Sequence, residues 1–191
     1  MSVEIFPYVP KLVVEHDRLP NVPTSWNGLE RIIPDIIRRF CGGKSYLALE
    51  FGVWHGYSTA ALANHFRRVI GVDIFEGDLL AGTTAPMLET TAKTLEPWPN
   101  IELRKESYQR FFTYHYFQPE LIHIDILHTY EDTFACGAIA LTRAECVIFH
   151  DTISFTEVRR AVGDLSQIFG RKFYNYYDSE GLGILARTDA A

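Results

Sequence analysis

The sequence predicts an α/β fold built on a doubly wound, mostly parallel seven-stranded sheet that ends in an antiparallel C-terminal strand pair. Two observations lead to this prediction. From about residue 46 onward, short apolar segments rich in β-branched residues alternate with segments of helical period, which is typical of a parallel sheet with helices on both faces. The last two strand-like segments are joined only by Ser179, Glu180 and Gly181, and so short a connection requires an antiparallel pair.

The elements are expected in a regular order along the chain. A helix is predicted over residues 25–40, with Ser25 as its candidate N-cap and Pro34 starting a second turn or kinking it. Strands are predicted at residues 46–51, 68–75, 100–106, 120–127, 145–151, 171–179 and 182–187. Helices are predicted between them at residues 58–66, 84–95, 108–117, 130–141 and 156–169.

The N-terminal residues 1–25 differ from the rest of the chain. They hold four prolines and show no sustained period, so we interpret them as an arm and residues 26–191 as a single domain. The arm is expected to cover a site or to mediate a homodimer. It shows no basic segment followed by an apolar one, and no apolar run in the chain is long enough to span a bilayer, so a cytoplasmic location is expected.

Composition limits the classes of function. The chain has 191 residues, 47% of them hydrophobic, and a formal net charge of -6, which argues against a surface built to bind nucleic acid. Its three cysteines, Cys41, Cys136 and Cys146, show no paired spacing. A disulfide framework and a zinc site are therefore both disfavoured, and small apolar residues in a reduced compartment are expected.

The segment LALEFGVWHGYST at residues 47–59 has the layout of a buried strand, a glycine-rich turn and a helix. A dinucleotide-binding loop requires G-x-G-x-x-G so that the backbone can approach a pyrophosphate. Gly52 and Gly56 are present, but Trp54 occupies the position of the second glycine. We therefore expect a nucleoside ligand without phosphates, and rank an NAD-dependent oxidoreductase behind it.

Two carboxylates follow the first two strands of the predicted sheet. Glu50 lies at the carboxyl end of the first strand, and Asp73 ends the second. An acidic side chain at the Asp73 position can accept hydrogen bonds from ribose hydroxyls. Paired carboxylates repel phosphate and attract a cation or an amine. One ligand that combines ribose, an ammonium group and a positive sulfur without phosphate is S-adenosylmethionine.

Acids and histidines gather at the ends of the fourth and fifth strands. Asp125 ends the fourth strand and is followed by His128, whereas His150 and Asp151 end the fifth. Because adjacent strand ends of a parallel sheet lie close together, we expect these four side chains to converge. Such clusters bind a divalent metal or move protons. Packing by His150 and helix capping by Asp151 are the structural alternatives.

Glu50, Gly52 and Gly56 match an acidic residue followed by G-x-x-x-G, and on this motif the sequence resembles the class I S-adenosylmethionine-dependent methyltransferases. The resemblance implies a Rossmann-like fold and S-adenosylmethionine as the cofactor. It implies that Glu50 contacts the amino group of the methionine part, that Asp73 holds the ribose, and that Ser107 lies near the adenine. The cofactor-binding residues that it implies are Glu50, Gly52, Gly56, Ser58, Asp73, Ser107 and Asp125.

The segments IDILHTYED and VIFHDT are similar to a pattern found in macrocin-type sugar O-methyltransferases and cephalosporin-hydroxylase-like proteins. This resemblance places Asp125, His150 and Asp151 at metal-ligand positions. It places His128 at the position of the general base, so that Asp125 and His128 are the implied catalytic residues. The fifth-strand pair here is His-Asp rather than two carboxylates, which extends the metals to be considered from Mg²⁺ to Mn²⁺, Fe²⁺ or Zn²⁺.

Together these features predict an S-adenosylmethionine-dependent methyltransferase that acts on a hydroxyl of a small molecule or sugar, with metal assistance left open. A metal-independent methyltransferase and a non-catalytic binding subunit of the same fold are the alternatives. The expected partner is a small-molecule acceptor, and neither nucleic acid nor a membrane is expected.

Overall fold

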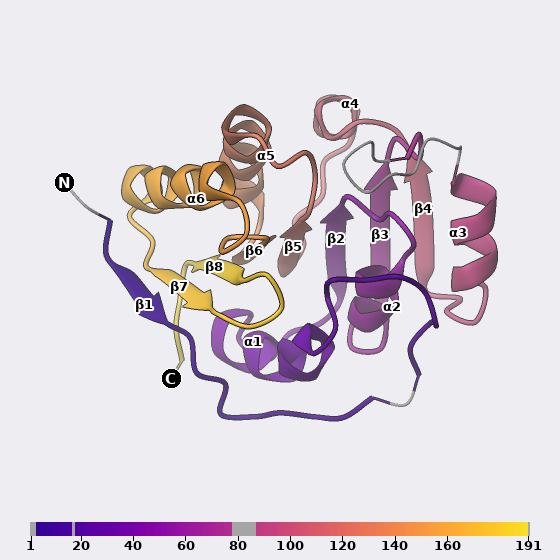
Figure 1. Ribbon diagram of the computed structural model, residues 1–191, viewed down its shortest axis with the longest axis horizontal. Coiled ribbons are helices and arrows are strands. Elements are labelled where there is room, and N and C mark those ends of the chain that lie inside the picture. The colour runs from indigo at the N-terminus through magenta and orange to yellow at the C-terminus, as the bar shows by residue number, and fades with distance from the viewer. Residues whose placement is uncertain (1–2, 17, 78–86, 191) are drawn as a thin grey trace.

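The computed structural model describes residues 3–16, 18–77 and 87–190, and within them eight strands form one sheet (Figure 1). The order across the sheet is β1-β7-β8-β6-β5-β2-β3-β4. The strands are β1 (Ile5–Pro7), β2 (Leu47–Phe51), β3 (Arg68–Asp73), β4 (Ile101–Lys105), β5 (Leu121–Ile124), β6 (Cys146–His150), β7 (Phe173–Tyr176) and β8 (Leu182–Ala186). The helices are η1 (Leu29–Ile32, a 3-10 helix), α1 (Ile33–Phe40), α2 (Tyr57–Ala63), α3 (Leu88–Leu95), α4 (Tyr108–Tyr114), α5 (Tyr130–Arg143) and α6 (Thr156–Phe169).

The predicted fold class is confirmed, and the sheet gains one strand beyond the seven expected. All neighbouring strands are parallel except that β8 runs antiparallel to both β6 and β7. The additional strand is β1, which pairs in parallel with β7 so that Ile5 lies opposite Phe173. Its three residues end at Pro7, which has no N–H to donate and is tolerated at the edge of a sheet. So short a strand leaves no alternating pattern in the sequence.

The first predicted helix begins later than its sequence suggested. Ser25 caps no helix, and a 3-10 turn at Leu29 leads directly into α1. Pro34 lies in the first turn of α1, where its missing N–H costs no hydrogen bond, so it starts the helix and does not kink it. The predicted start of the third helix at residue 84 lies outside the described residues.

Two hydrophobic layers cover the sheet because strand residues alternate between its faces. Ala48 packs in the layer formed by α1, α2 and α3, whereas its neighbour Leu49 packs in the layer formed by α4, α5 and α6. No helix within the described residues is long and apolar enough to cross a membrane.

The strand order creates a crevice at the carboxyl end of β2. From β2 the chain continues to β3 and β4 on one side, while β5 and β6 lie on the other side. In open α/β sheets, ligands bind at the point where the winding direction changes. The functional side chains are therefore expected above the ends of β2, β3, β5 and β6.

Candidate active site

A cavity of about 860 Å³ opens at this crevice and joins the two groups of side chains predicted from the sequence. Its wall brings together the following predicted site residues: Gly52, Ser58, Asp73, Ser107, Asp125, His128 and Asp151. Three other predicted site residues, Glu50, Gly56 and His150, do not line it. The wall also includes residues of the N-terminal arm, among them Pro23 and Ser25.

The glycine turn after β2 is shaped by contact with β5. Gly52 has φ +89°, and a Cβ atom there would lie 1.7 Å from the backbone carbonyl oxygen of Asp125. A side chain at this position would therefore collide with backbone, which cannot move away as a flexible side chain could. Trp54 also has a positive φ, +48°, and lines the cavity. The turn thus brings the ends of β2 and β5 into direct contact at the cavity floor.

Asp73 holds this turn in place from the end of β3. Its Oδ2 accepts hydrogen bonds from the backbone N–H groups of Val53, at 2.8 Å, and Trp54, at 3.0 Å. Its Oδ1 accepts one from the N–H of Phe75 at 2.7 Å. A carboxylate offers about four acceptor sites, so Asp73 keeps the capacity to accept a ligand hydroxyl.

Glu50 lies apart from the other predicted cofactor residues. Its side chain is fully buried, and its carboxylate accepts a hydrogen bond from the Thr59 hydroxyl and contacts His123 Nδ1 at 2.9 Å. Strand alternation explains this position, because Glu50 pairs in register with His123 and both side chains point toward the α1–α2 layer. Glu50 therefore supports the cavity from below and does not form its wall.

Ser107 follows β4 and begins α4. Its Oγ accepts a hydrogen bond from the backbone N–H of Arg110 at 3.3 Å, which makes it the N-cap of the helix. Ser107 also lines the cavity beyond the end of β4, and its place near the adenine stays a prediction.

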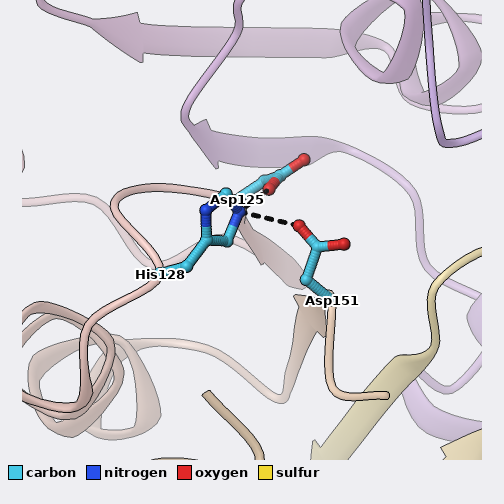
Figure 2. Close-up of side chains that lie close together, drawn as sticks. All are labelled: Asp125, His128 and Asp151. Atoms are coloured by element: carbon cyan, nitrogen blue, oxygen red, sulfur yellow. Dashed lines mark ion pairs between the residues drawn. The ribbon is translucent and has the colours of Figure 1, made fainter. Parts of the chain in front are cut away.

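The ends of β5 and β6 bring Asp125, His128 and Asp151 together (Figure 2). His128 Nε2 lies 2.7 Å from Asp151 Oδ2 and 3.7 Å from Asp125 Oδ1. One ligand atom from each of the three residues lies within 4.8 Å of the other two. The expected convergence of these side chains is therefore present in the structure.

His150 approaches the same carboxylates from beneath. Its Nδ1 lies 3.3 Å from Asp125 Oδ2 and 3.4 Å from Asp151 Oδ2, and its Nε2 lies 3.1 Å from the carbonyl oxygen of Ser179. The side chain is 1% exposed. His150 thus contacts the cluster as a buried partner, and its ring is not part of the cavity wall.

Charges within the cluster shift its protonation strongly. Burial alone lowers the pKa of His128, but the carboxylates of Asp125 and Asp151 outweigh burial and raise that pKa to about 9. Burial likewise lowers the pKa of His150, and Asp125 and Asp151 raise it to about 10. Burial raises the pKa of the two carboxyl groups, but the histidines outweigh it and hold both values below their usual range. Perturbed groups that face a cavity are typical of functional sites.

Strained backbone accompanies three of the strand ends. Trp54 lies after β2 with a φ of +48°, Phe75 lies after β3 with a φ of +52°, and Asp151 lies after β6 with a φ of +62°. Side chains other than glycine adopt this region at a cost, and such residues concentrate at functional sites. The strain at Asp151 coincides with its contact to His128.

Among the cavity residues that were not predicted from the sequence, two pack against histidine rings of the site. Phe155 stacks on the His128 ring with centroids 4.0 Å apart and planes 10° apart. Trp26 packs edge-on against the His123 ring with centroids 5.1 Å apart. Nothing in the local sequence marks either residue, because the contacts depend on how the arm and the β6–α6 connection fold over the sheet.

Carboxylates outnumber cationic side chains in the cavity wall, where His128, with its pKa of about 9, supplies positive charge. Among the described residues, no lysine or arginine lines it. Its acidic residues are Asp73, Glu106, Asp125, Asp132, Asp151 and Glu180. The wall therefore favours neutral or cationic ligands over anionic ones.

Comparisons with known proteins agree with this architecture. Residues 49–152, more than half of the chain, match a family described as a methyltransferase domain. No curated protein sequence matches the chain.

Solved structures of O-methyltransferases share the fold at low sequence identity. The O-methyltransferase NovP has a TM-score of 0.69 at 16% identity, covering 84% of this chain and 81% of its own. An O-methyltransferase from Bacillus cereus, solved with S-adenosylhomocysteine, has a TM-score of 0.61 at 16% identity, covering 88% and 84%. TomG from Streptomyces achromogenes, solved with S-adenosylmethionine, has a TM-score of 0.58 at 13% identity, covering 78% and 75%. The chain belongs to the methyltransferase domain family, and its fold is that of the class I S-adenosylmethionine-dependent methyltransferases.

Proposed function

We propose that this methyltransferase transfers the methyl group of S-adenosylmethionine to a hydroxyl of a small molecule or sugar. The observation that carries the proposal is the single cavity wall shared by Asp73 and Ser107 at one end and by His128 and Asp151 at the other. Such a wall can bind a nucleoside at one end and present a proton acceptor to a second ligand at the other end. The similarity to macrocin-type and cephalosporin-hydroxylase-like proteins supports a sugar or natural-product acceptor.

The cofactor is proposed to lie along the carboxyl ends of β2 and β3. Gly52 and Ser58 face it, Asp73 accepts a ribose hydroxyl, and Ser107 lies near the adenine. Gly56 does not line the cavity. Its φ of +86° allows the turn to continue into α2, so it shapes the site through the backbone. Glu50 orders His123 and Thr59 beneath the site, and direct contact of Glu50 with the amino group would require its carboxylate to leave those partners.

Methyl transfer from a sulfonium is a displacement at carbon, so the protein contributes mainly position and proton removal. His128 accepts the proton of the acceptor hydroxyl through its imidazole, and Asp151, 2.7 Å away, orients the ring and stabilises the imidazolium that forms. Phe155 fixes the ring from one face by stacking. Asp125 closes the other side of the cluster and borders the cofactor site.

The cluster also fits a divalent metal. Metal–ligand bonds of about 2.0–2.2 Å place ligand atoms within about 4.4 Å of one another, so atoms within 4.8 Å need little movement. Asp125 and Asp151 would hold the ion, with His128 or His150 as a nitrogen ligand, and the mixed donor set admits Mn²⁺ as well as Mg²⁺. A bound cation would lower the pKa of the acceptor hydroxyl.

The test of this proposal separates cofactor binding from proton removal. In His128→Ala, turnover with sugar and phenolic acceptors should fall about a hundredfold or more. Affinity for S-adenosylhomocysteine should stay near that of the wild type, because the imidazole lies at the acceptor end. Turnover is measured by S-adenosylhomocysteine formation and affinity by calorimetry.

His65→Ala is the matched control, since His65 lies outside this cavity. It should retain both turnover and affinity. Equal turnover of His128→Ala and the wild type would remove His128 from the mechanism. Turnover that survives complete chelation of divalent metals would favour the metal-independent form of the reaction.

A further inference from the structure

One residue of the cavity wall, Trp26, carries a buried hydrogen-bond donor that has no partner among the described residues. Trp26 belongs to the segment that links the N-terminal arm to η1, and it is 2% exposed. It lines the cavity, yet its indole Nε1–H has no hydrogen-bond partner among the described residues. Buried indole N–H groups usually have a partner, so an unpaired one on a residue that lines a cavity points to a ligand as its acceptor.

Trp26 lies near one end of the proposed cofactor site. Its ring packs against His123 of β5 and, with centroids 6.4 Å apart, against His150 of β6. Asp73 ends β3 and Ser107 follows β4, and both strands lie on the opposite side of β2 from β5 and β6. Trp26 therefore lies away from the adenine and ribose end and close to the end where the amino-acid part would lie.

The chemistry of the indole defines the group it can bind. An indole N–H only donates, so its partner must be an acceptor. The amino-acid part of the cofactor offers a carboxylate as an acceptor, whereas its ammonium only donates. No lysine or arginine among the described residues lines the cavity, so this carboxylate has no such side chain to pair with, and the buried N–H of Trp26 is a suitable donor for it.

We propose that Trp26 binds the methyl donor, with its indole N–H donating a hydrogen bond to the carboxylate of the amino-acid part. This inference rests on the proposed use of S-adenosylmethionine. It makes the segment that links the N-terminal arm to η1 part of the binding site. The chain is fixed on both sides of Trp26. Before it, Asn64 Nδ2 donates a hydrogen bond to the carbonyl oxygen of Arg18 at 2.7 Å. After it, Ser179 Oγ donates one to the carbonyl oxygen of Asn27 at 2.6 Å.

The test compares two ligands on Trp26→Phe, which keeps an aromatic ring and removes the N–H. S-adenosylhomocysteine carries the carboxylate, and 5′-methylthioadenosine lacks the whole amino-acid part. Calorimetry should show an affinity for S-adenosylhomocysteine about tenfold weaker in the variant, as for one lost hydrogen bond to a charged group. Affinity for 5′-methylthioadenosine should be unchanged.

Trp98→Phe is the matched control. Trp98 is also buried, but its Nε1–H donates to Asn64 Oδ1 at 2.8 Å and its ring lies outside the cavity. This variant should change neither affinity. If the wild type binds neither ligand, the proposed function itself fails.

If the wild type binds both and Trp26→Phe weakens both equally or neither, the inference about the carboxylate is wrong and Trp26 only packs against His123. Should the variant not fold, the wild-type indole N–H resonances provide the answer. The Trp26 signal, assigned by elimination with Trp54→Phe and Trp98→Phe, should move on addition of S-adenosylhomocysteine and stay in place with 5′-methylthioadenosine. An unmoved signal would overturn the inference.

Discussion

His128 is held between two carboxylates in a setting that favours its charged form. Asp151 lies 2.7 Å and Asp125 3.7 Å from its Nε2, and together they outweigh the cost of burial. A general base must be neutral to accept a proton, so the same carboxylates that orient the ring also delay its deprotonation. If His128 is the base, as proposed, we expect the working pH of the enzyme to be set at this residue.

The ligand-free enzyme should show a pH profile governed by this cluster. Because His128 has a pKa of about 9, kcat/KM for the acceptor should rise with pH toward a midpoint near about 9. Asp151→Asn removes one of the carboxylates and should move the midpoint down toward the ordinary histidine value of about 6.5. Steady-state kinetics across pH measures both midpoints, and an unshifted midpoint in Asp151→Asn would assign the titration to another group.

The free energy of unfolding should fall with rising pH as His128 loses its proton. The pKa of His128 is higher in the folded protein than its usual 6.5, so its pairing with the carboxylates stabilises the fold fully below about pH 6.5. That contribution should be lost as the pH rises through about 9. Urea unfolding across this interval measures the loss, and His128→Gln should flatten it. A variant that keeps the wild-type slope would contradict the assignment.

At the scale of elements, the turn between β2 and α2 depends on a close approach to β5. Gly52 is the contact point, since a Cβ atom there meets the carbonyl carbon of Asp125 at 2.5 Å as well as its oxygen. The sequence motif identified this glycine for its closeness to a ligand. The structure adds a second reason, which is closeness to the neighbouring strand.

Gly52→Ala should therefore destabilise the protein strongly. Left-handed backbone costs about 1–2 kcal/mol for a residue with a Cβ, and an overpacked contact adds about 1–3 kcal/mol. Gly42→Ala is the matched control, because its φ is +61° and a Cβ there meets nothing within 4 Å. Urea unfolding should show a distinctly larger loss for Gly52→Ala, and equal losses would mean that β5 yields to the added methyl group.

At the scale of the whole molecule, the sequence predicted the sheet and most of the site but not how the chain ends cover them. Helical and strand periods are local, so the order of elements and the convergence of Asp125, His128 and Asp151 followed from them. The burial of Glu50 depended on register with His123, a long-range pairing that no local pattern records. The places of β1 and Trp26 likewise depended on contacts between distant segments.

The excess of carboxylates in the cavity wall predicts which nucleosides the cavity binds. Adenosine 5′-monophosphate should bind about tenfold or more weakly than 5′-methylthioadenosine, because its phosphate faces a wall of carboxylates without a lysine or arginine among the described residues. Calorimetry at low and high ionic strength should show the difference shrink as salt screens it. If adenosine 5′-monophosphate binds as tightly as 5′-methylthioadenosine, a cationic group must reach its phosphate in the cavity.

The pairing of β1 with β7 has a consequence for protein synthesis. Residues 5–7 are translated well before their partners at 173–175, because nearly the whole sheet lies between them in the chain. Pairings this distant in sequence form slowly and late. The segment that carries Trp26 is tied to the connection between β7 and β8, because Ser179 Oγ donates a hydrogen bond to the carbonyl oxygen of Asn27. We therefore expect the crevice to stay open on the ribosome until β7 and β8 have been translated. On this argument, capture of the cofactor is deferred until β7 and β8 are in place.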